Sequence, residues 1–260
     1  MATKLPRVSK KGYVLEGAGA QVLLFHGYTG SPYDLKPVAL FLNQHDLAVS
    51  VPLLGGHGTN MRDLAQVKSA RWIQQADEAL AKLDARRPIF LGGLSMGACL
   101  AIITAHNSNL CQALLLFAPA LSLKLSAELL ISSTRLGIIS SQLAIPKLSG
   151  SSDIADPQAR QKCPSYPEMP LSGLLEFDNI RMLAREQIPA IRIPIFMAFG
   201  SHDNVINLSE SSNYIKHMAL GPVVAKFYAR SQHVLTLDYD RDKLSADLLN
   251  FINTYDEQKL

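Results

Sequence analysis

The stretch IFLGGLSMGA, residues 89–98, gives the strongest indication of the fold of this 260-residue chain. Its first three residues form an apolar run that is typical of a buried strand, and the alanine-rich run after Gly97 is typical of a helix. Between them lies Gly93-Leu94-Ser95-Met96-Gly97, a G-x-S-x-G pattern in a strand–turn–helix setting. A serine on so tight a turn needs a strained backbone, and flanking glycines avoid clashes with the neighbouring strand and helix. The pattern is frequent by chance, so the role of Ser95 depends on the rest of the chain.

The composition fits one large α/β domain with room for an insertion. Hydrophobic residues make up 48% of the chain, and a net charge of +3 without a dense basic run gives no electrostatic case for nucleic-acid binding. The three cysteines lack metal-like spacing and predict free thiols in a reducing compartment. The first 17 residues lack the apolar core of a signal peptide, and no apolar run is long enough to span a membrane. We therefore expect a cytoplasmic protein, a monomer or homodimer, without stable membrane insertion.

Apolar runs alternate with helical patterns along most of the chain. The expected strands that bear on the site are residues 21–25, 47–51, 89–94, 113–117, 193–199 and 223–228. A helix is expected over 61–83. The alternation lapses over 120–191, where 121–143 is apolar with a helical pattern and prolines crowd 156–170. We therefore expect a mostly parallel central sheet with helices on both faces, built from 1–119 and 192–260, and a largely helical insertion, 120–191, over the site.

Three chemically complementary side chains follow predicted strands. Ser95, Asp203 and His233 each come shortly after a buried strand, and the carboxyl ends of parallel strands meet at one edge of a sheet. A serine needs a base to take its proton, and a carboxylate fixes the tautomer of a histidine base. The order Ser, Asp, His is that of the α/β-hydrolases. The pattern predicts that these residues form a catalytic triad.

Other assignments fit less well. His202 adjoins Asp203 and would point away from it, whereas His57 lies in a glycine turn without a metal-ligand partner at suitable spacing. The remaining alternatives lie in or near predicted helices, in an early loop or in the insertion: His26, His45, His106, His217, Glu176, Asp178, Glu186 and Glu210. Taken singly, Asp203 also fits a turn-forming residue and His233 a surface loop residue.

Acyl transfer also needs hydrogen-bond donors for the developing oxyanion. The N–H of Met96 lies at the start of the helix after Ser95, where negative charge is stabilised. The second donor should come from the loop after the strand 21–25, and we assign it to the N–H of Tyr28. We expect Tyr28 and Met96 to form the oxyanion hole.

Five motifs together carry a family resemblance over nearly the whole chain. They are LFHGYTGS (24–31), GGHG (55–58), GGLSMG (92–97), GSHDNVI (200–206) and SQHVLTLD (231–238). With these motifs the chain resembles the bacterial carboxylesterases and monoacylglycerol lipases of the α/β-hydrolase superfamily. The resemblance implies the α/β-hydrolase fold, the Ser95, Asp203 and His233 triad, the oxyanion hole of Tyr28 and Met96, and a small cap over about 120–191. The proline-rich part of that segment departs from the family pattern.

We therefore expect a serine hydrolase of carboxylic esters that works through an acyl-enzyme on Ser95, without cofactor or metal. The apolar stretch 121–143 favours a small-molecule ester with an apolar acyl chain, such as a monoacylglycerol or a short-to-medium ester. The alternatives on the same triad are a thioesterase, an acyltransferase or a carbon–carbon bond hydrolase. A non-catalytic binder would be expected to have a damaged triad, and all three residues are present.

Overall fold

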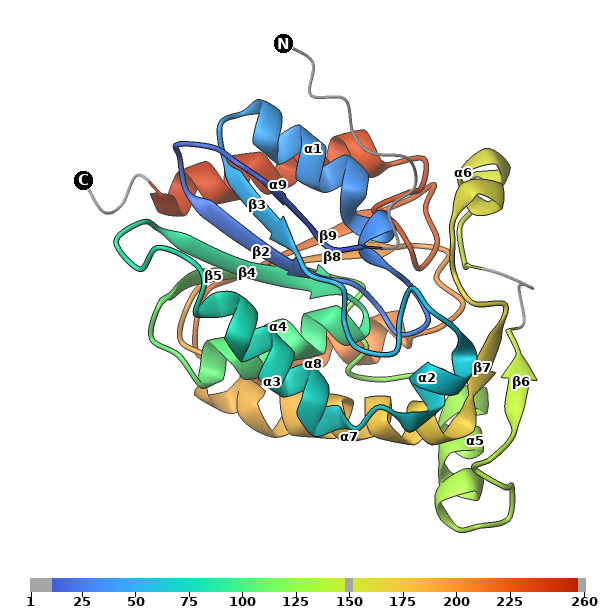
Figure 1. Cartoon of the computed structure of the whole chain (residues 1–260). Coiled ribbons are helices and arrows are strands. Elements are labelled where there is room, and N and C mark those ends of the chain that lie inside the picture. Colours follow the sequence, from blue (N-terminus) through green and yellow to red (C-terminus); the bar gives the residue numbers. More distant parts are fainter. Residues whose placement is uncertain (1–10, 148–151, 257–260) are drawn as a thin grey trace.

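The computed structural model describes residues 11–147 and 152–256, which build a seven-stranded sheet with helices on both faces (Figure 1). The strand order is β1-β3-β2-β4-β5-β8-β9, and only β1 runs antiparallel to its neighbour. The strands are β1 (Tyr13–Leu15), β2 (Gln21–Phe25), β3 (Ala48–Val51), β4 (Ile89–Leu94), β5 (Cys111–Phe117), β8 (Ile195–Gly200) and β9 (Val223–Tyr228). The expected α/β fold with a mostly parallel sheet is confirmed.

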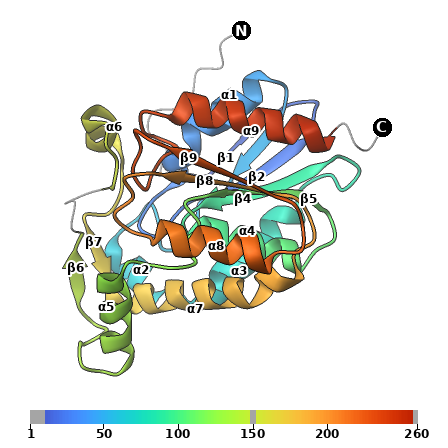
Figure 2. The same ribbon diagram turned by 180° about the vertical axis from the view of Figure 1, so that it is seen from behind.

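The middle of the sheet is the hydrophobic core. Every residue of β2, β4 and β8 is buried, because helices cover both faces of these apolar strands. Helices α1 (Lys36–Gln44) and α9 (Arg241–Asp256) lie on one face, and α3 (Ser69–Leu80), α4 (Met96–His106) and α8 (Leu208–Met218) lie on the other (Figures 1 and 2). Burial of apolar surface therefore fixes the frame from which the loops at the strand ends project.

The connection from β5 to β8 adds a layer outside this frame. It contains α5 (Leu125–Arg135), β6 (Ala144–Pro146), α6 (Pro157–Lys162), β7 (Glu168–Pro170), α7 (Leu171–Gln187) and the 3₁₀ turn η2 (Ile188–Ala190). β6 and β7 pair antiparallel, so two short strands accompany the helices of this segment. Helix α7 packs against α3 and α4, while α5 and the β6–β7 pair lie together at one end of the molecule (Figures 1 and 2).

Two expected helices differ from the structure. The helix expected over 61–83 is two helices, α2 (Met61–Gln66) and α3, separated by the extended residues Val67 and Lys68. The N–H and hydroxyl of Ser69 at the start of α3 donate to Oε2 of Glu176 on α7, at 3.0 and 2.9 Å. The stretch 121–143 is helical only over α5. At α3, a contact between distant segments marks where the helix begins.

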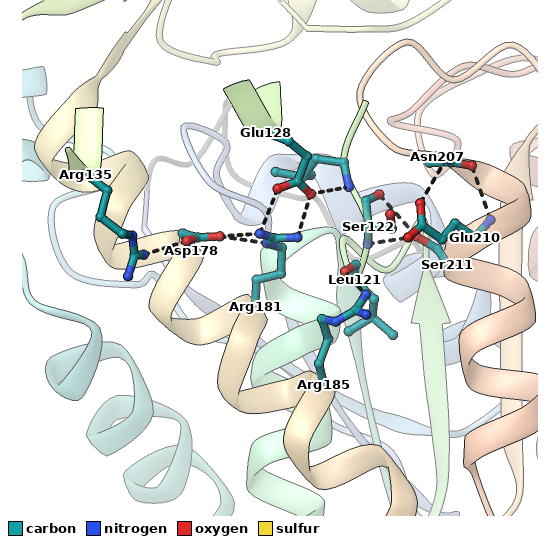
Figure 3. A network of polar contacts seen from close by, with 11 residues as sticks. Leu121, Ser122, Glu128, Arg135, Asp178, Arg181, Arg185, Asn207, Glu210 and Ser211 are labelled. Carbon is teal, nitrogen blue, oxygen red and sulfur yellow. Dashed lines mark hydrogen bonds and ion pairs between the residues drawn. The ribbon is translucent and has the colours of Figure 1, made fainter. Parts of the chain in front are cut away.

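Ion pairs fasten α5 to α7 (Figure 3). The buried guanidinium of Arg181 donates to both carboxylate oxygens of Glu128, at 2.7 and 3.0 Å. Its Nε donates to Asp178 at 2.7 Å, and Asp178 also accepts from Arg135 at 2.5 Å. The pairing is bidentate and largely shielded from water, which makes it more specific than an exposed ion pair.

Within 11–147 and 152–256, every helix is too short or too polar to cross a bilayer.

Candidate functional site

Ser95 lies on a strained turn between β4 and α4. Its φ of 57° and ψ of −112° are unusual for a residue with a side chain and are typical of functional turns. A Cβ on Gly97 would overlap the backbone of Phe25, and a Cβ on Gly93 would overlap the backbone of Gly97. Glycine is therefore required on both sides of Ser95, because neighbouring backbone segments leave no room for a side chain.

His233 and Asp203 form a buried hydrogen-bonded pair. His233 Nδ1 lies 2.7 Å from Asp203 Oδ2, and the two residues are 7% and 4% exposed. The other carboxylate oxygen accepts the N–H groups of Val205 and Ile206 at 2.7 and 3.0 Å. Because a carboxylate only accepts, Nδ1 carries the proton, and the Nε2 lone pair is left to act as a base.

The pair shifts the pKa values of both members in opposite directions. Burial alone would raise the pKa of Asp203, but the His233 contact and the two backbone N–H groups hold it below its ordinary value. Burial alone would lower the pKa of His233, but the negative charges of Asp203 and Asp153 outweigh burial and raise it. The structure therefore keeps Asp203 ionised and stabilises an imidazolium at His233.

Ser95 lies at the same edge of the sheet as this pair. It follows β4, whereas Asp203 and His233 follow the parallel strands β8 and β9. Among the described residues, Ser95 Oγ makes no hydrogen bond to His233. Hydrogen bonds of this kind are often long without substrate and shorten in the complex. The structure thus joins Asp203 and His233 directly and brings Ser95 to their edge.

The loop that carries Tyr28 lies against the Ser95 turn. A Cβ on Gly27 would be 3.4 Å from both Ser95 Cβ and Leu94 O. In the part of the chain that the structure describes, the N–H groups of Tyr28 and Met96 have no protein acceptor, so both are available to an oxyanion. The Tyr28 side chain has a different use: its hydroxyl donates to Pro170 O at 2.8 Å and its ring stacks on Phe177.

The two neighbouring histidines have structural roles. His26 Nδ1 contacts Gly27 O at 3.0 Å, and its Nε2 accepts the N–H of Leu54 at 3.1 Å. Burial lowers the pKa of His26 well below its ordinary value and that of His57 to about 4, so both rings are neutral. Within 11–147 and 152–256, no group of three His, Cys, Asp or Glu side chains is arranged to hold a metal ion.

Sequence reasoning did not find the contacts that hold the loops carrying Asp203 and His233. The turn after Asp203 bonds to the residues after β5: Asn207 N–H donates to Ser122 O at 3.0 Å, and Ser122 N–H donates to Ser211 Oγ at 3.0 Å (Figure 3). Two further carboxylates, Asp153 and Asp238, accept backbone N–H groups around His233. Asp153 lies 80 positions from His233, so no local pattern in the sequence indicates its contact.

Comparison with known proteins gives consistent results. A family model described as "Serine aminopeptidase, S33" (Hydrolase_4) matches residues 17–240. The chain is 25% identical over 243 residues to a thermostable monoacylglycerol lipase of Bacillus sp. (strain H-257), covering 92% of each protein. It is 25% identical over 252 residues to a carboxylesterase of Bacillus subtilis (strain 168), covering 96% of this chain and 98% of that protein.

A solved structure described as one of two metagenome-derived lipolytic enzymes, LipS and LipT, superposes with a TM-score of 0.81 at 22% identity, covering 94% of this chain and 98% of the other. This likeness concerns the fold. The family model spans most of the chain, including Ser95, Asp203 and His233. On that match, the chain belongs to the Hydrolase_4 family of α/β-hydrolases, described as serine aminopeptidase S33.

Proposed function

We propose that this chain hydrolyses carboxylic esters through an acyl-enzyme on Ser95, with His233 as general base and Asp203 as the partner of His233. The observation that carries the proposal is the 2.7 Å bond between His233 Nδ1 and Asp203 Oδ2 at the sheet edge that also bears the strained Ser95 turn. The relatives named monoacylglycerol lipase and carboxylesterase support the reaction class.

The proposed reaction has two halves. His233 Nε2 takes the proton of Ser95 as Oγ bonds to the ester carbonyl carbon, and the carbonyl oxygen becomes an oxyanion that accepts the N–H groups of Tyr28 and Met96. The tetrahedral adduct then breaks its bond to the alcohol oxygen, which receives the proton from His233. In the second half water donates its proton to His233 and attacks the acyl carbon, and the acid leaves as Ser95 regains its proton.

The substrate we propose is a monoacylglycerol or a short-to-medium ester with an apolar acyl chain. A surface hollow beside Asp203 has a mixed lining, with Leu125, Ile206 and Leu208 as its apolar residues and Lys124, Ser201, Asn207 and Ser209 as its polar residues. Leu125 on α5 is 73% exposed, and an apolar ligand would shield it from water. The exposed Leu125 and the apolar stretch 121–143 support an acyl chain as the bound group, and we propose that the segment 120–191 caps the site.

A substrate panel tests this proposal. Nitrophenyl esters of increasing acyl length and a monoacylglycerol should be hydrolysed, whereas aminoacyl nitroanilides, which test the aminopeptidase activity in the family description, should not. Activity confined to peptides, to thioesters, to acyl transfer or to carbon–carbon cleavage would assign the same residues to another reaction.

The Ser95→Ala variant tests the nucleophile. Loss of a triad member leaves only about 10³–10⁴-fold acceleration over water, from the oxyanion hole and binding, and labelling by a fluorophosphonate should disappear. The conservative comparison is Ser108→Ala, which removes a hydroxyl that accepts only the N–H of Leu110 among the described residues. An unchanged rate in Ser95→Ala would refute the proposed mechanism.

The thiols of the chain bear on where the enzyme acts. Cys99, Cys111 and Cys163 are unpaired thiols, which supports a reducing compartment such as the cytoplasm. We propose that the enzyme acts there as a monomer or homodimer, which sedimentation measurements would test.

A further inference from the structure

Asp153 binds backbone groups in both of the loops that carry Asp203 and His233. It lies in the connection between β5 and β8 and is 9% exposed. Its Oδ2 accepts the N–H of His233 at 3.2 Å and the N–H of Asn204 at 2.9 Å. Its Oδ1 accepts the side-chain amide of Asn204 at 2.9 Å, and its own carbonyl accepts the N–H of Val234 at 3.0 Å. One residue therefore contacts both loops that supply the catalytic base and its carboxylate.

Asp238 makes the reciprocal contacts from the loop after His233. Its Oδ2 accepts the N–H groups of Gln232 and Ala155, both at 2.8 Å, and its Oδ1 accepts the N–H of Asp156 at 2.9 Å. Asp238 is fully buried. The segments 153–156 and 232–238 thus exchange charge-assisted hydrogen bonds, which are stronger than neutral ones and hold the two backbones in register.

We infer that Asp153 is a positioning residue of the catalytic pair: its carboxylate fixes the separation of the Asp203 and His233 backbones. The inference rests on the proposed function. The bond between Asp203 and His233 joins loops that follow two different strands, so its length depends on how those loops are held. A misplacement of about 1 Å, even from a change outside the reacting atoms, can cost roughly 10²-fold in rate.

The charge of Asp153 has a second effect. The charged groups that interact electrostatically with His233 are Asp203, Asp153, Lys147 and Asp34. Burial lowers the pKa of His233, Asp203 and Asp153 raise it, and Lys147 lowers it. Removal of the Asp153 charge should therefore lower the pKa of His233 and shift the acid limb of the activity profile to lower pH.

Asp156 provides a matched control in the same segment. Its side chain caps α6 by accepting the N–H groups of Gln158 and Ala159, at 2.9 and 3.3 Å, and it lies 3.7 Å from Arg241. Its backbone N–H, which binds Asp238, is kept in any substitution other than proline. The Asp156→Ala variant therefore weakens the segment without removing a carboxylate from the catalytic loops.

The experiment compares the wild type with Asp153→Ala, Asp153→Asn, Asp156→Ala and Ser95→Ala on the nitrophenyl ester that the wild type prefers. Steady-state kinetics, pH profiles and thermal unfolding are measured for each. For Asp153→Ala we expect kcat to fall about 10²-fold with KM within roughly twofold, whereas Asp156→Ala should lower the unfolding temperature and keep kcat.

The Asp153→Asn variant separates the charge from the hydrogen bonds. Its amide oxygen can still accept from the N–H groups of His233 and Asn204, so we expect a smaller loss of kcat and an acid limb at lower pH. Should Asp153→Ala fail to fold, this pH shift carries the test. The inference is overturned when folded Asp153→Ala keeps the wild-type kcat, or when Asp156→Ala loses as much kcat as Asp153→Ala. It is also overturned when the acid limb of the pH profile of Asp153→Asn stays where it is in the wild type. Equal ester hydrolysis by the wild type and Ser95→Ala would instead overturn the proposed function, and the inference with it.

Discussion

The β4–α4 unit and the part of the β5–β8 connection that contains α5 and α6 are held in place by different forces. Every residue of β4 is buried, and α4 is buried from Met96 to Ala105. In the connection, α6 has no buried residue, and α5 buries only Ile131 and Thr134. The first region is fixed by apolar packing on all sides. In the second, α5 is held by ion pairs with α7, and the residues before α6 are held by polar contacts with the loops that carry Asp203 and His233, whereas α7 itself is buried against α3 and α4.

Because of this difference, a change in one region should mainly affect the stability of the fold, and a change in the other should mainly affect the positions of side chains at the site. Burial of apolar surface is non-directional and strong, so damage to the β4–α4 unit should be felt by the whole fold. A polar contact between distant residues fixes position and contributes less net free energy. Changes in the connection should therefore cost less stability for the same displacement, and those beside His233 should affect catalysis.

Two glycines give the largest expected contrast between the regions. In Gly97→Ala the new Cβ overlaps the backbone of Phe25, which cannot move without moving β2, so we expect a loss of about 3 kcal/mol or more in the free energy of unfolding. Gly137, after α5, has a φ of +75° but no atom within 4 Å of an added Cβ. Gly137→Ala should cost only about 1–2 kcal/mol, from the backbone conformation. Urea unfolding measures both losses, and equal losses would contradict the contrast.

The ion cluster of the connection gives the next largest effect. Arg181→Met leaves the carboxylate of Asp178, which is 5% exposed in its side chain, with Arg135 as its remaining cation. Breaking a buried pair costs about 3–5 kcal/mol, and the remaining partner should reduce this to about 2–3 kcal/mol. The double variant Arg181→Met with Asp178→Leu should recover part of the loss, because no buried charge is left unpaired.

The control for the ion cluster is Arg71→Met. Arg71 pairs with Glu78 at 3.4 Å, and both side chains are about half exposed. Exposed pairs contribute little, so the change should stay below about 0.5 kcal/mol in chemical denaturation. A loss as large as that of Arg181→Met would mean that burial does not distinguish the two ion pairs.

A smaller effect is expected where α7 supports α3. Glu176 accepts the N–H and hydroxyl of Ser69 and pairs with Lys68 at 2.9 Å, so Glu176→Ala should cost about 1 kcal/mol, as loss of a helix cap does. Burial alone would raise the pKa of Glu176, but its contacts with Ser69 and Lys68 lower it. The folded state therefore binds this proton less tightly than the unfolded chain, and the contribution is present above pH 4.5 and is lost as pH falls through the lowered pKa. The difference from the wild type should shrink in acid unfolding curves.

The same contrast explains how much the sequence could predict. The β4–α4 unit was predictable because its apolar run, its two glycines and its alanines all act within ten residues. The break between α2 and α3 was not predictable, because Val67 and Lys68 carry no turn chemistry and the cause is a carboxylate on α7. The fold class and the family are confirmed.

The candidate site also has one contact that the sequence predicts and another that it does not. The contact between Asp203 and His233 follows from strand order, because parallel strands bring their carboxyl ends to one edge. The role of Asp153 does not follow from any such rule, since its partners Asn204 and His233 lie 51 and 80 positions away. Apolar periodicity places strands and helices, but it carries no information on which carboxylate reaches which backbone N–H.

The smallest expected effect concerns the pH dependence of activity. In the proposed mechanism His233 must be neutral to take the proton of Ser95. The charges of Asp203 and Asp153, which outweigh burial, raise the pKa of His233 above its ordinary value of 6.5. The wild type should therefore show less than half of its plateau kcat/KM at pH 6.5. The contribution of His233 to stability should fall as pH rises, which is opposite to the change in activity. The ionised ring stabilises the folded state below pH 6.5, and this contribution is lost as pH rises through the pKa of His233 in the folded state. If activity and stability both fall in acid, the loss of activity would instead indicate partial unfolding. Kinetic and thermal-unfolding measurements made in parallel between about pH 5 and 9 distinguish protonation of His233 from partial unfolding.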